Sequence, residues 1–311
     1  MKKMIIAFLA VTLVFSLIGC DAMLNVMDKM SNNVAGTEKK VIEDSLNAAK
    51  PVPSEKKDPE DVKNEDGTTT TTTTFTQSSG EESKPLFSIV EKKEEVVDSS
   101  TLETITKTTE AKLSFGLGEE YDIPLNAGSA KKLAEVEAVL TPTDLTDVIL
   151  GLKSGSKSEI EAELKKEADE SSKKAAKGTQ TVLKVLVESF IDPSSMTPEN
   201  ENEEKVLETV NMILGNTSSE EEPKKMTQAD VVVLTALNNV IFNNVEGVVG
   251  TLATINNEEA SDESKDKASK QLMETVLNEA TTLVDIVSVV PSDMAGGIKD
   301  VLGLFMTSSG K

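Results

Sequence analysis

Residues 227–256 read TQADVVVLTALNNVIFNNVEGVVGTLATIN and carry the clearest helical periodicity in the chain. Large aliphatic residues recur there at spacings of three and four, which places them on one face of a helix. These residues are Leu234, Leu237, Ile241, Val245, Val248, Leu252 and Ile255. Thr227 with Asp230 matches a helix start, and the asparagines lie largely off the apolar face. The stretch therefore predicts a core helix.

Comparable patterns on both sides predict further helices. Helix starts are expected near Ser129, Thr141 or Thr143, Ser158 and Thr197, and again after Pro291. Gly178 is expected to interrupt the charged helix that begins near Ser158, and Gly215 occupies a C-cap position. Residues 126–311 are long enough for a single core. We therefore expect an all-α domain, a helical bundle of about six helices.

Residues 51–84 differ sharply in composition from the helical region. Three prolines and many charges precede seven consecutive threonines at positions 68–74. Such a segment has little apolar surface to bury and is typical of a disordered linker. Threonine also favours extended structure, so a Thr-rich edge strand through Phe75 is the alternative. We expect a disordered, Thr-rich tether over this range.

Residues 85–125 give a mixed pattern. Leu113, Phe115 and Leu117 alternate with polar or small residues, which is typical of a short strand. The threonine-rich residues 102–109 are expected to pair with it. Gly116 and Gly118 do not complete a phosphate-binding glycine motif and are better explained by a turn. We expect a small β element, a collar with short strands, before the helical domain.

The charge composition excludes several classes of function. The chain holds 32 Lys and 54 Asp plus Glu, has neither Arg nor His, and carries a formal net charge of -22. Such a charge repels phosphate polyanions, so nucleic-acid binding is not expected. The lack of histidine removes the commonest general base and zinc ligand. With no Trp and few other aromatic residues, the chain also offers little surface for stacking on sugars or bases.

No pattern in the chain predicts a catalytic or metal site. A Ser-x-x-Lys spacing, as at Ser171 and Lys174, recurs in several places, which a chain rich in both residues produces by chance. The acidic runs at 199–204 and 220–222 lack the alternating ligand spacing of a calcium loop. We therefore expect a protein that is not an enzyme, with no catalytic residues, no cofactor and no bound metal.

The N-terminus has the organisation of an export signal. Lys2 and Lys3 precede an apolar stretch of about 14 residues, which is too short to span a bilayer. The stretch ends in Leu17-Ile18-Gly19-Cys20, and Cys20 is the single cysteine of the chain. This run resembles the lipobox of bacterial lipoprotein precursors. The resemblance implies that Leu17, Ile18 and Gly19 are recognised by the signal peptidase, that the chain is cut before Cys20, and that the thiol carries a diacylglyceryl group.

The segment after Cys20 contains an apolar face at helical spacing. Its members are Met23, Leu24, Met27, Met30 and Val34. Either this face lies on lipid headgroups as a juxtamembrane helix, or it packs onto the protein's own domain. The full expected organisation is a signal peptide over 1–19, a lipidated N-terminus and juxtamembrane helix over 20–50, the tether over 51–84, the collar over 85–125 and the helical domain over 126–311.

Together these patterns predict a lipoprotein of the bacterial cell envelope, anchored through lipid on Cys20. We expect a non-enzymatic interaction or surface-display module whose partners are the membrane, through its covalent lipid, and an unidentified protein. The alternative is a carrier that holds a lipid or other apolar ligand between helices. Which membrane carries the protein, and whether its domain reaches the cell surface, are left open by the sequence.

Overall fold

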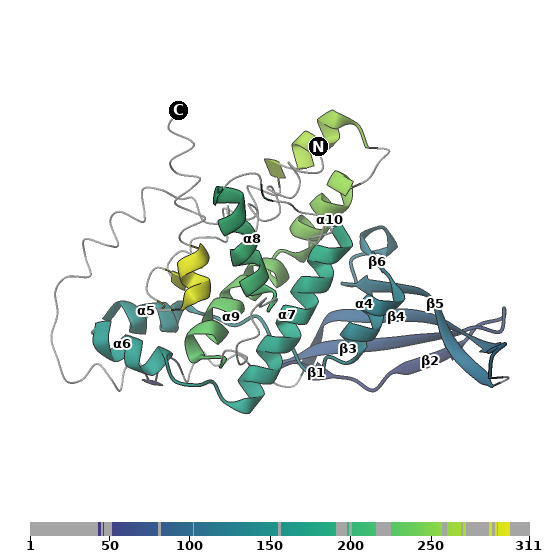
Figure 1. Ribbon diagram of the computed structural model, residues 1–311, viewed down its shortest axis with the longest axis horizontal. Coiled ribbons are helices and arrows are strands. Elements are labelled where there is room, and N and C mark those ends of the chain that lie inside the picture. Colours follow the sequence, from purple (N-terminus) through teal and green to yellow (C-terminus); the bar gives the residue numbers. More distant parts are fainter. Residues whose placement is uncertain are drawn as a thin grey trace.

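The computed structural model describes residues 43, 44, 46, 52–79, 82–101, 103–154, 157–190, 198, 201–215, 225–256, 260–268, 270, 271, 286, 287, 290 and 292–298. An antiparallel sheet lies at one end of the molecule and a group of helices at the other (Figure 1). The fold is therefore α+β, and the expected all-α bundle is wrong.

The sheet is built from residues on both sides of the threonine run. Its strands are β1 (Glu55–Lys56), β2 (Glu60–Lys63), β3 (Thr69–Ser79), β4 (Glu82–Val97), β5 (Thr104–Ser114) and β6 (Ile123–Leu125). The order is β1-β3-β4-β5-β6, with β2 also paired to β3, and every pairing is antiparallel. Residues 104–109 do not pair with the strand through Leu113; they belong to the same strand, β5.

The expected disordered tether over residues 51–84 is also wrong. Residues of this range form β1, β2, β3 and the start of β4. Strand β3 is not an edge strand either, since β1 and β2 pair along one side and β4 along the other. Thr71, Thr73 and Phe75 alternate into the interior and are at most 8% exposed. Phe75 stacks on Phe87, its partner in register, with 4.7 Å between the ring centroids. The apolar partners that order the threonines thus come from the next strand.

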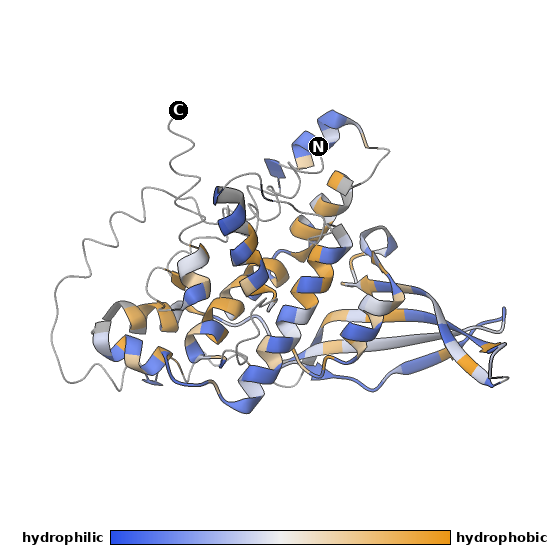
Figure 2. Cartoon of the chain, viewed as in Figure 1, coloured by the Kyte–Doolittle hydropathy of each residue, from blue (hydrophilic) through white to orange (hydrophobic). Residues whose placement is uncertain are grey.

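Helices follow the sheet along the chain. They are η1 (Glu119–Tyr121), α4 (Ala127–Ala134), α5 (Thr146–Ser154), α6 (Lys157–Leu164), α7 (Glu170–Phe190), α8 (Glu201–Ile213), α9 (Gln228–Phe242) and α10 (Val245–Asn256). Helices α4 and α7 cover one face of the sheet, where Leu133, Val182 and Val185 pack with the buried strand residues. Apolar residues gather at these contacts, while the outer helix faces are largely hydrophilic (Figure 2).

Helix α9 begins as predicted. Thr227 Oγ1 accepts the amide of Asp230, and the Asp230 carboxylate accepts the amide of Thr227 in return. The helix ends sooner than expected, because Asn243 caps it and α10 starts at Val245 after a bend of 73°. Asparagine favours such helix ends. Within the described ranges no single helix has the length and apolarity of a membrane span, and α9 with part of α10 meets that test only as this bent pair.

An extended segment, residues 138–143, joins two apolar cores, and we call it the strap. Val139 packs into the core beneath the sheet, and the adjacent Leu140 packs into the core among the helices. Both side chains are at most 1% exposed. Because the strap is neither helix nor sheet interior, its backbone groups need partners from elsewhere.

Those partners come from elements distant in sequence. The strap exchanges hydrogen bonds with Ser54, which donates its amide to Val139 O and accepts the Val139 amide on Oγ, both at 2.9 Å. Thr179 of α7 accepts the Leu140 amide at 2.8 Å. Asn238 of α9 donates to Leu140 O at 2.7 Å. Further bonds come from Gln77 to Pro142 O, and from Asn239 to both the amide and the carbonyl of Thr143.

The expectation that the asparagines of α9 lie off the core face is therefore wrong for Asn238 and Asn239. Asn238 is fully buried and Asn239 is 9% exposed, so both lie inside the protein rather than off its core face. Gly178 was also misread, because α7 runs through it without interruption. A Cβ atom at Gly178 would lie 1.9 Å from the carbonyl oxygen of Ala138, so glycine lets the strap touch the helix.

We predict that Thr179→Val destabilises the protein by about 1–3 kcal/mol, because it leaves the buried Leu140 amide without its acceptor. Valine keeps the shape of threonine, so the loss is confined to the hydrogen bond. Thr181→Val on the same helix is the matched control, since the Thr181 hydroxyl bonds the Lys177 carbonyl within α7. Its effect is expected within about 0.5 kcal/mol. Urea unfolding measures both variants, and equal stability of the two would contradict the role of the strap.

Candidate functional site

Cys20, predicted to carry the lipid, and Leu17, Ile18 and Gly19, predicted for recognition by the signal peptidase, lie outside the described residues. Most of the expected juxtamembrane segment, 20–50, also lies outside them. Its described end contacts the helical part of the molecule. Leu46 packs partly buried against the helical core, and Glu43 Oε1 lies 4.0 Å from Lys166 Nζ, just after α6.

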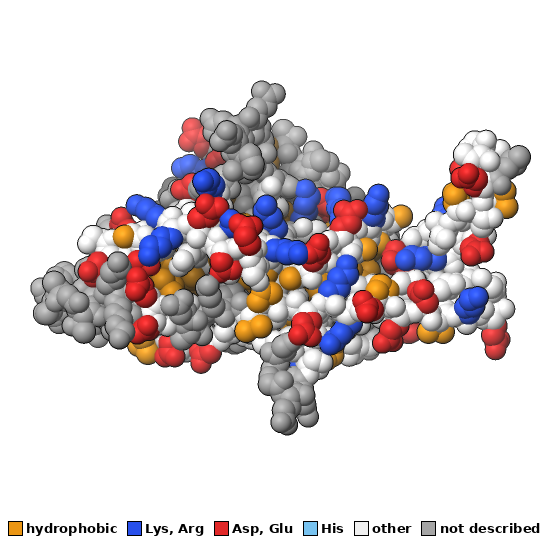
Figure 3. All heavy atoms as spheres, turned by 90° about the horizontal axis from the view of Figure 1, so that it is seen from below, with side chains coloured by type: hydrophobic (Ala, Val, Ile, Leu, Met, Phe, Trp, Pro, Cys, Tyr) orange, Lys and Arg blue, Asp and Glu red, His pale blue; other side chains and the backbone are white. Residues whose placement is uncertain are grey.

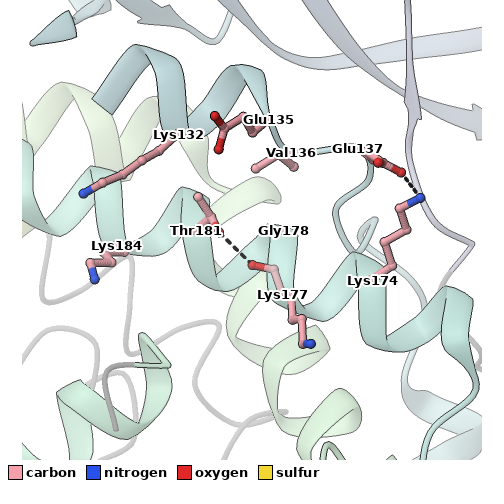
Figure 4. Close-up of a pocket in the computed structure, with 9 residues that line it drawn as sticks. All are labelled: Lys132, Glu135, Val136, Glu137, Lys174, Lys177, Gly178, Thr181 and Lys184. Carbon is pink, nitrogen blue, oxygen red and sulfur yellow. Dashed lines mark hydrogen bonds and ion pairs between the residues drawn. The ribbon is translucent and has the colours of Figure 1, made fainter. Parts of the chain in front are cut away.

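A cleft of about 420 Å³ lies between α7 and the segment that leaves α4. It is lined by Lys132, Glu135, Val136, Glu137, Lys174, Lys177, Gly178, Thr181 and Lys184. Figure 4 shows that its lysine side chains do not converge: Lys174 points to Glu137, with which it pairs, whereas Lys177 and Lys184 point elsewhere. Lys132 pairs with Glu188 at 3.5 Å. The cleft is thus a surface of local ion pairs rather than a focused anion site.

A second cleft, of about 470 Å³, lies beside the end of the strap. Its lining includes the amide side chains of Gln77 and Asn239, which already bond the strap backbone. Their polar groups therefore serve the fold. Val136 is the large aliphatic residue of the first cleft, which is otherwise lined mainly by lysine and glutamate, and Leu145 is that of the second.

Of the earlier motif residues, Ser171 and Lys174 lie one turn apart near the start of α7, where Lys174 pairs with Glu137. The acidic residues 220–222 lie outside the described residues. Ser54, which begins one Ser-x-x-Lys spacing, uses its hydroxyl to bind the strap amide of Val139. Among the residues that the structure describes, no three Asp or Glu side chains lie close enough together to hold a metal ion.

The surface that stands out is the far end of the β4–β5 hairpin. Pairing between β3 and β4 ends at Thr69 with Lys93, whereas β4 and β5 continue as two strands alone. We call this part, residues 94–101 and 103–107, the arm. It projects from the body at the end of the sheet (Figures 1 and 3). Two-stranded ribbons bury little apolar surface, so the arm is held mainly by its own pairing and turn.

Apolar residues of the arm face water. Val97 is 65% exposed and Ile105 is 42% exposed, and Ile105 is paired in register with Val96. Val62 on β2, which borders the sheet's other side, is 61% exposed. Hydrophobic side chains at the end of the projecting arm are visible in Figure 3. Val97 and Ile105 on the thin ribbon are not part of the buried core and are candidates for contact with a partner.

The arm is also acidic. It carries Glu94, Glu95, Asp98 and Glu103 against Lys107, a net charge of −3 from four carboxylates and one amine. The turn is closed by the Asp98 amide, which donates to Glu103 O at 2.9 Å. Asp98 Oδ1 accepts from the hydroxyl and the amide of Ser100, and these hydrogen bonds lower the pKa of the Asp98 carboxyl.

One backbone edge of the arm is open. Strand β6 pairs with β5 at Ala111, Lys112 and Leu113. From Thr104 to Glu110, β5 has a neighbour on one side, β4, among the described residues. Sequence reasoning missed this site, although alternation of threonine with Ile105 and Lys107 is a strand signal that was present.

Comparison with protein-family models, curated proteins and solved structures finds no match to this chain.

We predict that the arm turn loosens on acidification, and that the transition falls at a lower pH than the titration of an ordinary aspartate. Because the pKa of Asp98 is lowered from 3.8, its ionised form stabilises the turn above that value. This stabilisation is lost as the pH falls through the folded-state pKa. The amide resonance of Ser100, followed by NMR from about pH 6 to pH 2, should show a midpoint below 3.8.

The matched variants are Ser100→Ala, which removes one donor, and Ser99→Ala, which leaves both donors in place. Ser100→Ala should move the Asp98 midpoint upward and Ser99→Ala should not. A wild-type midpoint at or above the ordinary value would refute the assigned hydrogen bonds.

Proposed function

We propose that this protein is a lipid-anchored lipoprotein of the bacterial cell envelope whose α+β domain is a non-enzymatic interaction module. The observation that carries the proposal is the run Leu17-Ile18-Gly19-Cys20 after a basic start and a short apolar stretch. Two or three acyl chains on one residue hold a protein far more firmly than a single chain does, so no spanning helix is needed.

The shape of the domain supports presentation of the arm. Glu43, the first described residue, lies beside Lys166 at the α6 end of the molecule. In Figure 1, where the longest axis is horizontal, α6 lies at one end and the arm at the other. Anchoring through Cys20 thus tethers the domain from the α6 end and leaves the arm at the end remote from it.

The same geometry shortens the expected tether. Because residues 51–84 belong to the sheet, the chain available between the lipid and the domain is residues 21–42. The length of the domain's own long axis, rather than residues 51–84, therefore carries the arm away from the membrane.

An interaction module is favoured over an enzyme because polar side chains that line the two clefts bond or pair within the protein. The amides of Gln77 and Asn239 bond the strap, and Lys132 and Lys174 of the 420 Å³ cleft pair with glutamates of the protein itself. By contrast, Val97 and Ile105 of the arm are exposed and have no role in the core. Exposed apolar residues framed by charged ones are typical of contact surfaces.

Cys20→Ala should abolish lipidation and leave the uncleaved precursor. Intact-mass measurement on membrane extracts should find wild-type protein that lacks residues 1–19 and carries added acyl mass, whereas the variant retains all 311 residues. Ser16→Ala, which keeps the four-residue run intact, is the control and should behave as wild type. Acylation that survives Cys20→Ala would overturn the proposal.

The orientation is tested by energy transfer from the protein to dye-labelled headgroups in vesicles that hold the lipidated protein. Since Cys20 is the single cysteine and its thiol is acylated, Ser99→Cys in the arm and Ser171→Cys at the start of α7 each introduce one reactive thiol on an exposed residue. Transfer should be weaker from position 99. Equal or stronger transfer from the arm would contradict the proposed presentation.

A further inference from the structure

We infer that the arm binds a basic, extended segment of a partner protein, which adds as a strand along the open edge of β5. This inference rests on the proposed function and names the partner chemistry of the arm. Strand addition supplies affinity through main-chain hydrogen bonds and specificity through side chains at alternate positions. Both elements are present on the arm.

The backbone edge has the length that strand addition needs. Residues 104–110 extend past the pairing with β6 and lie on one strand with no bulge opposite residues 104–108. The register shift of this hairpin falls between Lys92 and Lys93, where Thr109 has no partner in β4. The outer part of β5 is thus a regular template of about five residues, close to the usual length of a strand.

The side chains around this edge determine which strand fits. Ile105 lies near the outer end of the open edge and shares a face of the ribbon with Val96, its partner in register, so an incoming strand can bury apolar surface against Ile105. Glu94, Glu95, Asp98 and Glu103 surround these residues with negative charge. Charge complementarity therefore favours a segment in which apolar residues alternate with lysine or arginine.

The same charges disfavour a second copy of this chain as the occupant. Two arms would bring together two ribbons of net charge −3 each. In an antiparallel pairing of two copies centred on the open edge, Lys107 of one copy faces Lys107 of the other. A lysine in the middle of an edge strand is a common device against self-association. The partner is thus a different, basic chain.

The test uses the purified full-length mature protein and two short capped peptides, one of alternating lysine and valine and one with glutamate in place of each lysine. Fluorescence anisotropy at low salt should show the basic peptide binding at least about tenfold more tightly than the acidic peptide. Amide hydrogen exchange of residues 104–110, read by NMR, should slow on binding, while exchange at residues 98–101 should stay unchanged.

The charge requirement is tested with two double variants that remove the same number of carboxylates. Glu94→Gln with Glu103→Gln lies in the arm, and Glu201→Gln with Glu208→Gln lies on exposed positions of α8. The arm variant should bind the basic peptide about threefold to tenfold more weakly, whereas the α8 variant should stay within about twofold of wild type. NMR spectra confirm that each variant is folded.

Three results would overturn the inference: equal binding of the two peptides, binding without slower exchange along residues 104–110, or a dimer of the protein formed through the arm. The last would show that a second copy occupies the edge. Because the peptides are tested on purified protein, failure here leaves the envelope anchor standing, and loss of lipidation evidence would leave peptide binding untouched.

Discussion

The structure depends on the need to satisfy the backbone of the strap away from water. An unpaired buried amide or carbonyl costs as much as a lost hydrogen bond, so residues 138–143 can cross the interior only where side chains meet them. Thr179, Asn238 and Ser54 supply those side chains from α7, α9 and the segment before β1. One extended segment thereby sets the position of the helices relative to the sheet.

This constraint explains two residues whose local context is misleading. Asn238 lies in an otherwise apolar helix and is fully buried, because its amide is the donor that Leu140 O requires. Gly178 lies inside α7, where glycine is unfavourable, because any larger residue would collide with the Ala138 carbonyl. Both choices weaken the helix locally and are compensated by contact with the strap.

The arm, unlike the strap, lies outside the two apolar cores. Where α4 and α7 cover the sheet, its residues are buried and its core is continuous with the rest of the protein. Beyond that cover, β4 and β5 continue with exposed valine and isoleucine and an acidic turn. A ribbon of this kind contributes little to stability, and its exposed apolar side chains are removed from water only if a partner covers them. The proposed anchor at the other end of the molecule suits that use.

Local signals in the sequence determined the acidic composition without His or Arg, the lipobox-like run at Cys20, and the start of α9 at Thr227 and Asp230. Each of these is a property of neighbouring residues and needs no knowledge of the fold. The sheet, the strap and the arm were decided by tertiary structure. Thr73 and Phe75 lie in a strand because Ile89 and Phe87 pair with them. The asparagines of α9 turn inward because a segment nearly a hundred positions away needs their amides. Seven threonines read alone are compatible with a disordered linker or a strand, since the free energy that separates the two comes from long-range burial and pairing.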